Sequence, residues 1–235
     1  GKPMEKRELL YEGKAKRIYA TSDPELVWVE YKDSATAFDG QKKATISGKG
    51  VLTNRITSLI FTKLAEAGIS SHFVQQLSET EQLVKKVSII PLEVVVRNYS
   101  AGSFSTRVGM EEGIELPRPL VEFYYKDDAL GDPLLTEDHI EILDLASKED
   151  VANLKAQALR VNEILSQLMA EVGVILVDFK LEFGRDGVGK ILLADEISPD
   201  TCRFWDAKTM QKLDKDVFRR DLGSLTDAYT IILNK

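Results

Sequence analysis

The sequence predicts an α+β protein built from antiparallel sheets with flanking helices, and three observations support that class. Apolar runs with strand spacing fill the first third of the chain and recur at 87–99 and 176–184. Two longer segments, 50–68 and 147–173, repeat their apolar residues with helical spacing. A glycine-containing turn at 185–189 joins two neighbouring strands, as in a hairpin.

The N-terminal elements are mainly strands. Residues 7–21 predict two short strands around Gly13, and strict alternation of apolar residues predicts a half-buried strand over 26–32. A helix over 50–68 follows, because its apolar residues fall on one stripe. Gly68 suits the end of that helix.

The later elements are more mixed. Residues 87–99 predict one strand, or two strands separated by Pro91, which lacks the N–H that a ladder needs. The acidic, proline-containing segment 111–145 has little periodicity, so we expect loops and short elements there. The clearest helix covers 147–173, where Ser147 is a good N-cap residue. A last helix is expected over 215–235.

Composition excludes several classes of protein. The 235 residues are 43% hydrophobic and 29% charged, which is ordinary for a globular protein of one large domain or two lobes. No apolar run is long enough for a membrane span, and the first residues lack the core of a signal peptide. The net charge of −7 argues against nucleic-acid binding. Cys202 is the only cysteine, which fits the cytoplasm.

The segment "LVDFKLEFG" (176–184) is unusual because charges interrupt an apolar strand. Side chains alternate along a strand, so Asp178, Lys180 and Glu182 share one face, with about 6–7 Å between successive members. The opposite face should pack on the preceding helix. That apolar face comprises Ile175, Val177, Phe179, Leu181 and Phe183.

The return strand adds another carboxylate to the charged face. A two-residue loop at 186–187 would set Asp195 opposite Asp178, and a loop one residue later would set it opposite Lys180. A three-residue loop would bring Glu196 there instead. We prefer Asp195.

Two interpretations of this face remain open. It is either an exposed, salt-bridged surface or a divalent-cation site, because Mg²⁺ prefers one or two carboxylates together with phosphate oxygens. In the second case, Lys180 supplies a positive charge for a phosphoryl or carboxyl group.

Other segments could bind anions. Gly13, Lys14 and Lys16 form a basic turn that suits phosphate, or an ordinary hairpin, although the spacing is not that of a Walker A loop. Arg97 could bind a carboxylate or phosphate, or form an internal pair with Glu93 on the same strand face. Gly102 and Ser103 could donate to the same anion, and Arg203 could reach over the charged face or lie on the surface.

Taken together, four segments resemble those of the SAICAR synthetase family of purine biosynthesis. The similarity extends over nearly the whole chain, and the second and third segments resemble the two signatures of that family. These segments are "GKAKRIY" (13–19), "PLEVVVRNYSAGS" (91–103), "LVDFKLEFG" (176–184) and "DEISPDTCRFWD" (195–206).

The resemblance implies an activity and a fold. Such enzymes join L-aspartate to the carboxylate of carboxyaminoimidazole ribonucleotide (CAIR), using ATP and Mg²⁺, and yield SAICAR, ADP and phosphate. The implied fold is related to the ATP-grasp and protein-kinase type, with ATP between an N-terminal lobe (1–88) and a C-terminal lobe (89–235). Bacterial relatives imply a homodimer. A small-molecule kinase and a non-catalytic nucleotide-binding module are the rival hypotheses.

The resemblance also assigns roles to residues, in four groups. The nucleotide group is Gly13, Lys14, Ala15, Lys16, Ile89 and Ile90. The metal group is Glu182, Asp195 and Asp178. The CAIR group is Arg97, Ser103, Lys180 and Arg203. Lys180 and Asp178 are the expected catalytic residues.

Overall fold

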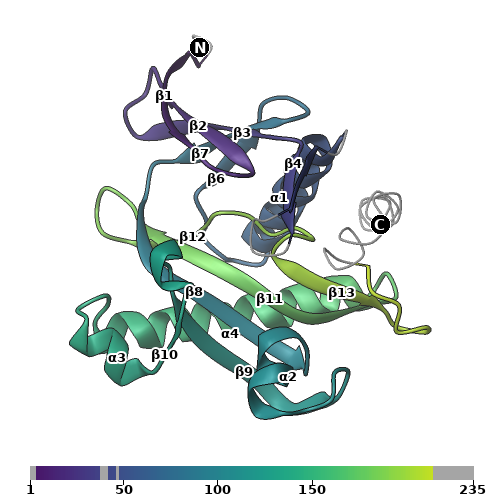
Figure 1. The fold of residues 1–235 in the computed structure, drawn as a ribbon. Coiled ribbons are helices and arrows are strands. Elements are labelled where there is room, and N and C mark those ends of the chain that lie inside the picture. The colour runs from purple at the N-terminus through teal and green to yellow at the C-terminus, as the bar shows by residue number, and fades with distance from the viewer. Residues whose placement is uncertain (1–3, 38–41, 46–47, 214–235) are drawn as a thin grey trace.

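The computed structural model describes residues 4–37, 42–45 and 48–213. Its first sheet comes from the N-terminal part of the chain and lies at the top of Figure 1, with strand order β1-β2-β3-β7-β6. All neighbours in this sheet are antiparallel. Its strands are β1 (Lys6–Glu12), β2 (Lys16–Thr21), β3 (Leu26–Tyr31), β6 (Phe73–Gln76) and β7 (Glu81–Lys85). Beside it, β4 (Ser34–Ala37) and β5 (Lys42–Thr45) form a separate hairpin.

The second sheet is larger and forms the lower layer in Figure 1, with order β10-β9-β8-β11-β12. Strand β13 also pairs with β11, next to β12 along the same edge. All its pairs are antiparallel, as predicted. Its strands are β8 (Ser88–Tyr99), β9 (Glu115–Tyr125), β10 (Leu134–Leu135), β11 (Val174–Arg185), β12 (Ile191–Ala194) and β13 (Cys202–Asp206).

The predicted long helices are present. Helix α4 (Lys148–Ala170) begins after Ser147, whose hydroxyl accepts from the Asp150 N–H in a capping box. Helix α1 (Lys49–Glu66) ends just before Gly68, whose φ of 92° suits the helix end. The short helices are α2 (Gly102–Val108), α3 (Glu137–Ile142) and the 3₁₀ turn η1 (Asp128–Leu130). The helix expected over 215–235 lies outside the described residues.

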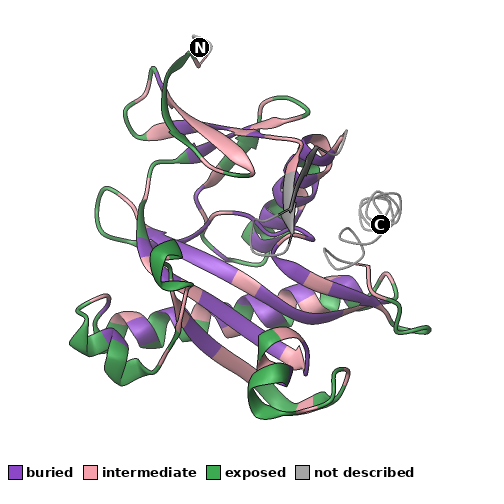
Figure 2. Cartoon of the chain, viewed as in Figure 1, coloured by how far each residue is buried: buried purple, intermediate pink, exposed green. Residues whose placement is uncertain are grey.

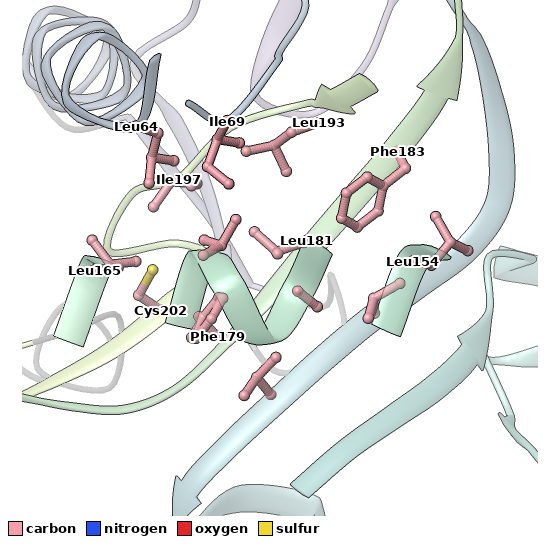
Figure 3. Packing of buried hydrophobic residues seen from close by; sticks show 14 of the residues in the cluster. Leu64, Ile69, Leu154, Leu165, Phe179, Leu181, Phe183, Leu193, Ile197 and Cys202 are labelled. Atoms are coloured by element: carbon pink, nitrogen blue, oxygen red, sulfur yellow. The ribbon is translucent and has the colours of Figure 1, made fainter. Parts of the chain in front are cut away.

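One core serves most of the molecule. Helices α1 and α4 bury their apolar residues in the same cluster as β8 and β11 (Figure 3). The N-terminal sheet has a smaller cluster of its own, made by Val27, Val29, Tyr31 and Val84. Figure 2 shows that β11 is buried along most of its length, whereas β8 is buried mainly in its second half, with Ser88 and Ile89 exposed at its start. The boundary after residue 88 stays a prediction, since α1 packs into the core of the larger sheet.

Three details differ from expectation. Strand β9 is 11 residues long and fills part of the segment expected to hold loops and short elements. Its prolines, Pro117 and Pro119, lie beyond the stretch that pairs with β10, where a missing N–H is tolerated. The alternation of β11 is also broken, because a register shift falls between Leu176 and Asp178. Leu176 therefore joins the main core, while Val177 packs with Trp205 in a separate cluster.

The hairpin register is the third difference. Residues 186–190 connect the strands, and Glu182 pairs with Ala194, so both registers that favoured Asp195 are wrong. The three-residue loop of the alternative is absent too, but, as in that alternative, continued pairing would set Glu196 opposite Lys180 on the charged face. If the pairing continued, Asp195 would lie opposite Leu181. Instead the chain leaves the extended conformation at Asp195, whose φ is 59°.

Candidate active site

The charged face of β11 lies beside a matching face of β8. Asp178 pairs with Arg97 and Glu182 pairs with Glu93 in the ladder. Because directly opposed residues of neighbouring strands share a face, this register brings the charges of two sequence-distant segments together. The prediction that Asp178, Lys180 and Glu182 share one face is confirmed at this level. The opening in that face is a pocket of 230 Å³ lined by Glu93, Val95, Arg97, Ser103, Tyr124, Asp132, Asp178, Phe179, Lys180, Thr201, Cys202 and Arg203.

Arg97 makes hydrogen bonds to several side chains at one end of this pocket. Its Nε donates to Glu122 at 2.6 Å and its Nη1 to Asp178 at 2.8 Å. Its Nη2 donates to the hydroxyls of Ser103 and Tyr124, both at 3.2 Å. The internal Glu93–Arg97 pair that the sequence left open is therefore wrong: the carboxylate partners of Arg97 are Glu122 and Asp178. An incoming anion could displace the two hydroxyls without breaking either ion pair.

Asp178 joins two arginines. Arg203 Nη1 lies 3.0 Å from each Asp178 carboxylate oxygen, opposite the bond from Arg97. Gly102 makes room for this arrangement, because a Cβ there would come within 2.6 Å of the Arg203 guanidinium. The structure thus brings together the predicted CAIR residues Arg97, Ser103 and Arg203 at one end of the pocket.

Glu122 and Tyr124 are site residues that the sequence did not reveal. Both lie on β9, in the segment expected to be loops. Glu122 is buried and bonds Arg97 with one oxygen and Arg107 with the other. The apolar alternation of "LVEFYY" was a signal for the strand, but the prolines before it concealed that signal.

Glu182 and Asp195 form the other end of the site. Lys16, at the start of β2, donates to Asp195 at 2.6 Å and thereby links the two sheets. Lys126 pairs with Glu182. Burial, together with the adjacent Asp195 carboxylate, raises the pKa of Glu182 to about 7 despite Lys126. Burial alone would raise the pKa of Asp195, but Lys16 and a hydrogen bond from Glu182 hold it well below its usual range.

Lys180 lies between the two ends. Its ammonium is 3.6 Å from a Glu93 carboxylate oxygen. Burial acts to lower the pKa of Lys180, but the carboxylates of Glu93 and Asp195 outweigh it, so the pKa is raised. Lys180 is therefore a cation rather than a neutral base.

The donor set fits Mg²⁺. The Asp195 carboxylate helps to raise the pKa of the buried Glu182, and a cation placed between the two carboxylates would relieve that repulsion. No group of three or more His, Cys, Asp or Glu side chains in the described part of the chain is arranged to hold a metal. Glu182 and Asp195 are two carboxylates, and Mg²⁺ commonly combines one or two carboxylates with phosphate oxygens and water. Asp178 does not fit this role, because it lies four positions, or about 13 Å, along the strand from Glu182 and both its oxygens accept from arginines.

The predicted nucleotide residues are placed less uniformly. The turn of Gly13 and Lys14 leads directly to Lys16 at the cleft, and the Gly13 N–H closes that turn on the Lys16 carbonyl at 2.9 Å. Ile89 is exposed beside the connection between the sheets, whereas the Ile90 side chain belongs to the core. Ile89 therefore remains a candidate for contact with adenine. The side chain of Ile90 is not a candidate, because it lies in the core.

We expect Glu182→Gln to change how stability depends on pH. The folded protein holds a proton at Glu182 that an unfolded carboxyl releases near pH 4.5, so this residue makes folding less favourable as pH rises from 4.5 to about 7. Glutamine removes that penalty. Without metal or nucleotide, the Tm of the variant minus that of the wild type should increase across this window by at least about 2 °C. A constant difference, as expected for the control Glu163→Gln on the surface, would contradict the shifted pKa.

These features define a class of protein: a two-sheet α+β protein whose cleft combines a basic turn, a carboxylate pair and a pocket lined by two arginines. The SAICAR synthetase family model matches residues 9–235. The chain belongs to that family.

Individual relatives agree. The chain is 64% identical to the phosphoribosylaminoimidazole-succinocarboxamide synthase of Lysinibacillus sphaericus, over 99% of this chain and 98% of that protein. It is 66% identical to the enzyme of the same name from Bacillus cereus, covering 99% and 97%. A crystal structure of the Ehrlichia chaffeensis synthase shares 47% identity with a TM-score of 0.93, covering 97% and 98%. A SAICAR synthetase solved in complex with ADP shares 50% identity with a TM-score of 0.92 over the same shares of both chains.

Proposed function

We propose that this chain is an ATP-dependent ligase that joins L-aspartate to the carboxylate of CAIR and yields SAICAR, ADP and phosphate. Family membership over nearly the full chain supports the reaction. The observation that carries the site assignment is the shared face of β8 and β11, where an arginine pocket and a carboxylate pair flank Lys180. The ADP complex of a relative supports the use of ATP.

The reaction must activate a carboxylate, which is a poor electrophile. A CAIR carboxylate oxygen attacks the γ-phosphorus of ATP, ADP leaves, and an acyl phosphate forms. The L-aspartate amine then attacks the acyl carbon, loses a proton, and displaces phosphate. Water must be kept from the activated carboxylate, and closure of the cleft over the substrates would limit its hydrolysis.

The residues divide this work. Arg203, Ser103 and Arg97 hold the CAIR phosphate, and Lys180 stabilises negative charge that develops between CAIR and ATP. Lys14 and Lys16 face the ATP phosphates. Glu182 and Asp195 would hold Mg²⁺, which, when bound, neutralises phosphate charge and polarises the transferred phosphoryl group.

Two further properties are part of the proposal. Among the described residues, none of the helices has the length and apolar character needed to cross a membrane, and we propose that the enzyme acts in the cytoplasm. We also propose that the enzyme forms a homodimer, as the resemblance to bacterial members of the family implies.

ADP release tests the proposed function directly. The enzyme should release ADP continuously only when ATP, CAIR and L-aspartate are all present. Sustained release of ADP without L-aspartate would instead indicate a small-molecule kinase. Binding of ATP with no release of ADP under any condition would indicate a nucleotide-binding module.

We expect Arg97→Lys to be damaging although it preserves charge. Arg97 reaches Glu122 and Asp178 with different nitrogens of one planar group, whereas a lysine donates from a single atom and cannot reproduce that geometry. A hydrogen bond between charged groups contributes about 1.5–3 kcal/mol, so the KM for CAIR should rise about tenfold or more, with a smaller change for ATP. The Tm should fall as well. Arg160→Lys, in an exposed pair with Glu163, is the control, and an unchanged KM for CAIR would remove Arg97 from substrate binding.

A further inference from the structure

His72 occupies the junction between the two sheets. The backbone N–H of His72 donates to the Leu193 carbonyl of β12 at 2.9 Å, and the backbone carbonyl of His72 accepts from the Lys85 N–H at 2.7 Å. The ring is buried and packs edge-on against Phe61. Because the backbone is bound on both sides, the ring has a fixed position.

The ring meets the backbone of a candidate metal ligand. His72 Nε2 lies 3.2 Å from the Asp195 carbonyl oxygen. A carbonyl only accepts, so Nε2 must carry the proton and donate. The contact is separate from the Asp195 carboxylate, which bonds Lys16.

Asp195 needs such a restraint. An extended residue here would point the same way as Leu193, two positions earlier, and Leu193 lies in the main core. The left-handed conformation, with φ of 59°, turns the carboxylate out of the core and toward Lys16 and Glu182. This conformation is unfavourable for a residue with a side chain, although aspartate adopts it more readily than most, so the surrounding contacts help to hold it.

We propose that His72 is a positioning residue for the reaction: its ring holds the Asp195 peptide in the left-handed conformation and so aims the Asp195 carboxylate at the metal position. The inference rests on the proposed function, because it assumes that Asp195 binds Mg²⁺. It assigns a role to a buried residue that contacts Phe61 and the backbone of Lys85, Leu193 and Asp195.

The affinity for ADP, measured by titration calorimetry with and without Mg²⁺, tests this role without turnover. Wild type should bind ADP more tightly with Mg²⁺. His72→Leu removes the donor and should reduce that gain about tenfold or more, as for other partners of metal ligands, while metal-free ADP binding stays within about twofold. His72→Gln places an amide donor near the Nε2 position and should retain the gain. His72→Asn, which is polar but too short, should behave like leucine.

Phe73→Leu is the matched control. It disturbs the same corner, where Phe73 packs edge-on against Phe61, but leaves the bond to Asp195. If His72→Leu and His72→Asn keep the full gain in ADP affinity with Mg²⁺, the inference is wrong. It is also wrong if Phe73→Leu or His72→Gln loses as much of that gain as His72→Leu does. Either result would leave the proposed function standing. Absence of any gain in wild type would overturn the metal site and this inference with it.

Discussion

Asp195→Asn should lower kcat at least about a hundredfold, the usual effect of removing one charge that stabilises a transition state. The substitution keeps the shape of the side chain but removes half of the carboxylate pair that would hold Mg²⁺. It also removes the carboxylate partner of Lys16. Burial acts to lower the pKa of Lys16, and the Asp195 carboxylate outweighs that effect and raises it. Raising the Mg²⁺ concentration should restore part of the activity. Steady-state kinetics at several Mg²⁺ concentrations measure both effects.

Asp150→Asn is a suitable control for Asp195→Asn. Asp150 also pairs with a cation at 2.6 Å, Arg185, but lies at the start of α4 outside the cleft. Loss of that pair should cost stability and leave kcat and the Mg²⁺ dependence unchanged. If Asp195→Asn behaves like Asp150→Asn, Asp195 is a structural ion-pair residue.

Lys180→Met should lose about a hundredfold or more in kcat, with a smaller change in the KM for ATP. Methionine keeps much of the apolar stem and deletes the charge. Lys180 lines the pocket beside Glu93, Asp178 and Arg203, where negative charge develops in the proposed reaction. The Tm should stay near that of wild type, because the ammonium lies at a cleft surface and not in the core.

Lys6→Met matches this change closely. Lys6 lies 3.5 Å from Glu81 with 38% of its side chain exposed, against 3.6 Å from Glu93 and 36% for Lys180. An ion pair of this kind contributes only about 0–1 kcal/mol to stability, so its removal should change the Tm little. Activity in Lys180→Met equal to that in Lys6→Met would return the charged strand to the interpretation of a salt-bridged surface.

Local patterns predicted the local structure well. Ser147 predicted the start of α4, and the alternating charges of β11 predicted three polar residues on one face. Both signals involve residues close in sequence, where backbone geometry alone fixes their relation.

Pairing between strands was harder to predict. The register shift before Asp178 moved Leu176 into the core, and the longer hairpin connection changed which residues face each other. Asp195 nevertheless reached the site, because one left-handed residue turned it there. Such changes depend on partners distant in sequence, such as His72, which no local pattern reveals.

The predicted roles were also refined by distance. Asp178 and Glu182 share a face, yet the rise of a strand separates them too far for one ion. Asp178 instead orders two arginines that come from β8 and β13. The sequence shows that these residues are charged, and the sheet order decides which of them meet.

Oxygen-18 transfer tests the central claim most directly, namely that this cleft uses ATP to activate the CAIR carboxylate. CAIR labelled in both carboxylate oxygens is incubated with the enzyme, ATP and L-aspartate, and the phosphate released is analysed by mass spectrometry. Because the attacking oxygen stays on phosphorus when the amine displaces phosphate, we expect one labelled oxygen in each phosphate and one in the SAICAR amide. Unlabelled phosphate formed together with SAICAR would contradict the account.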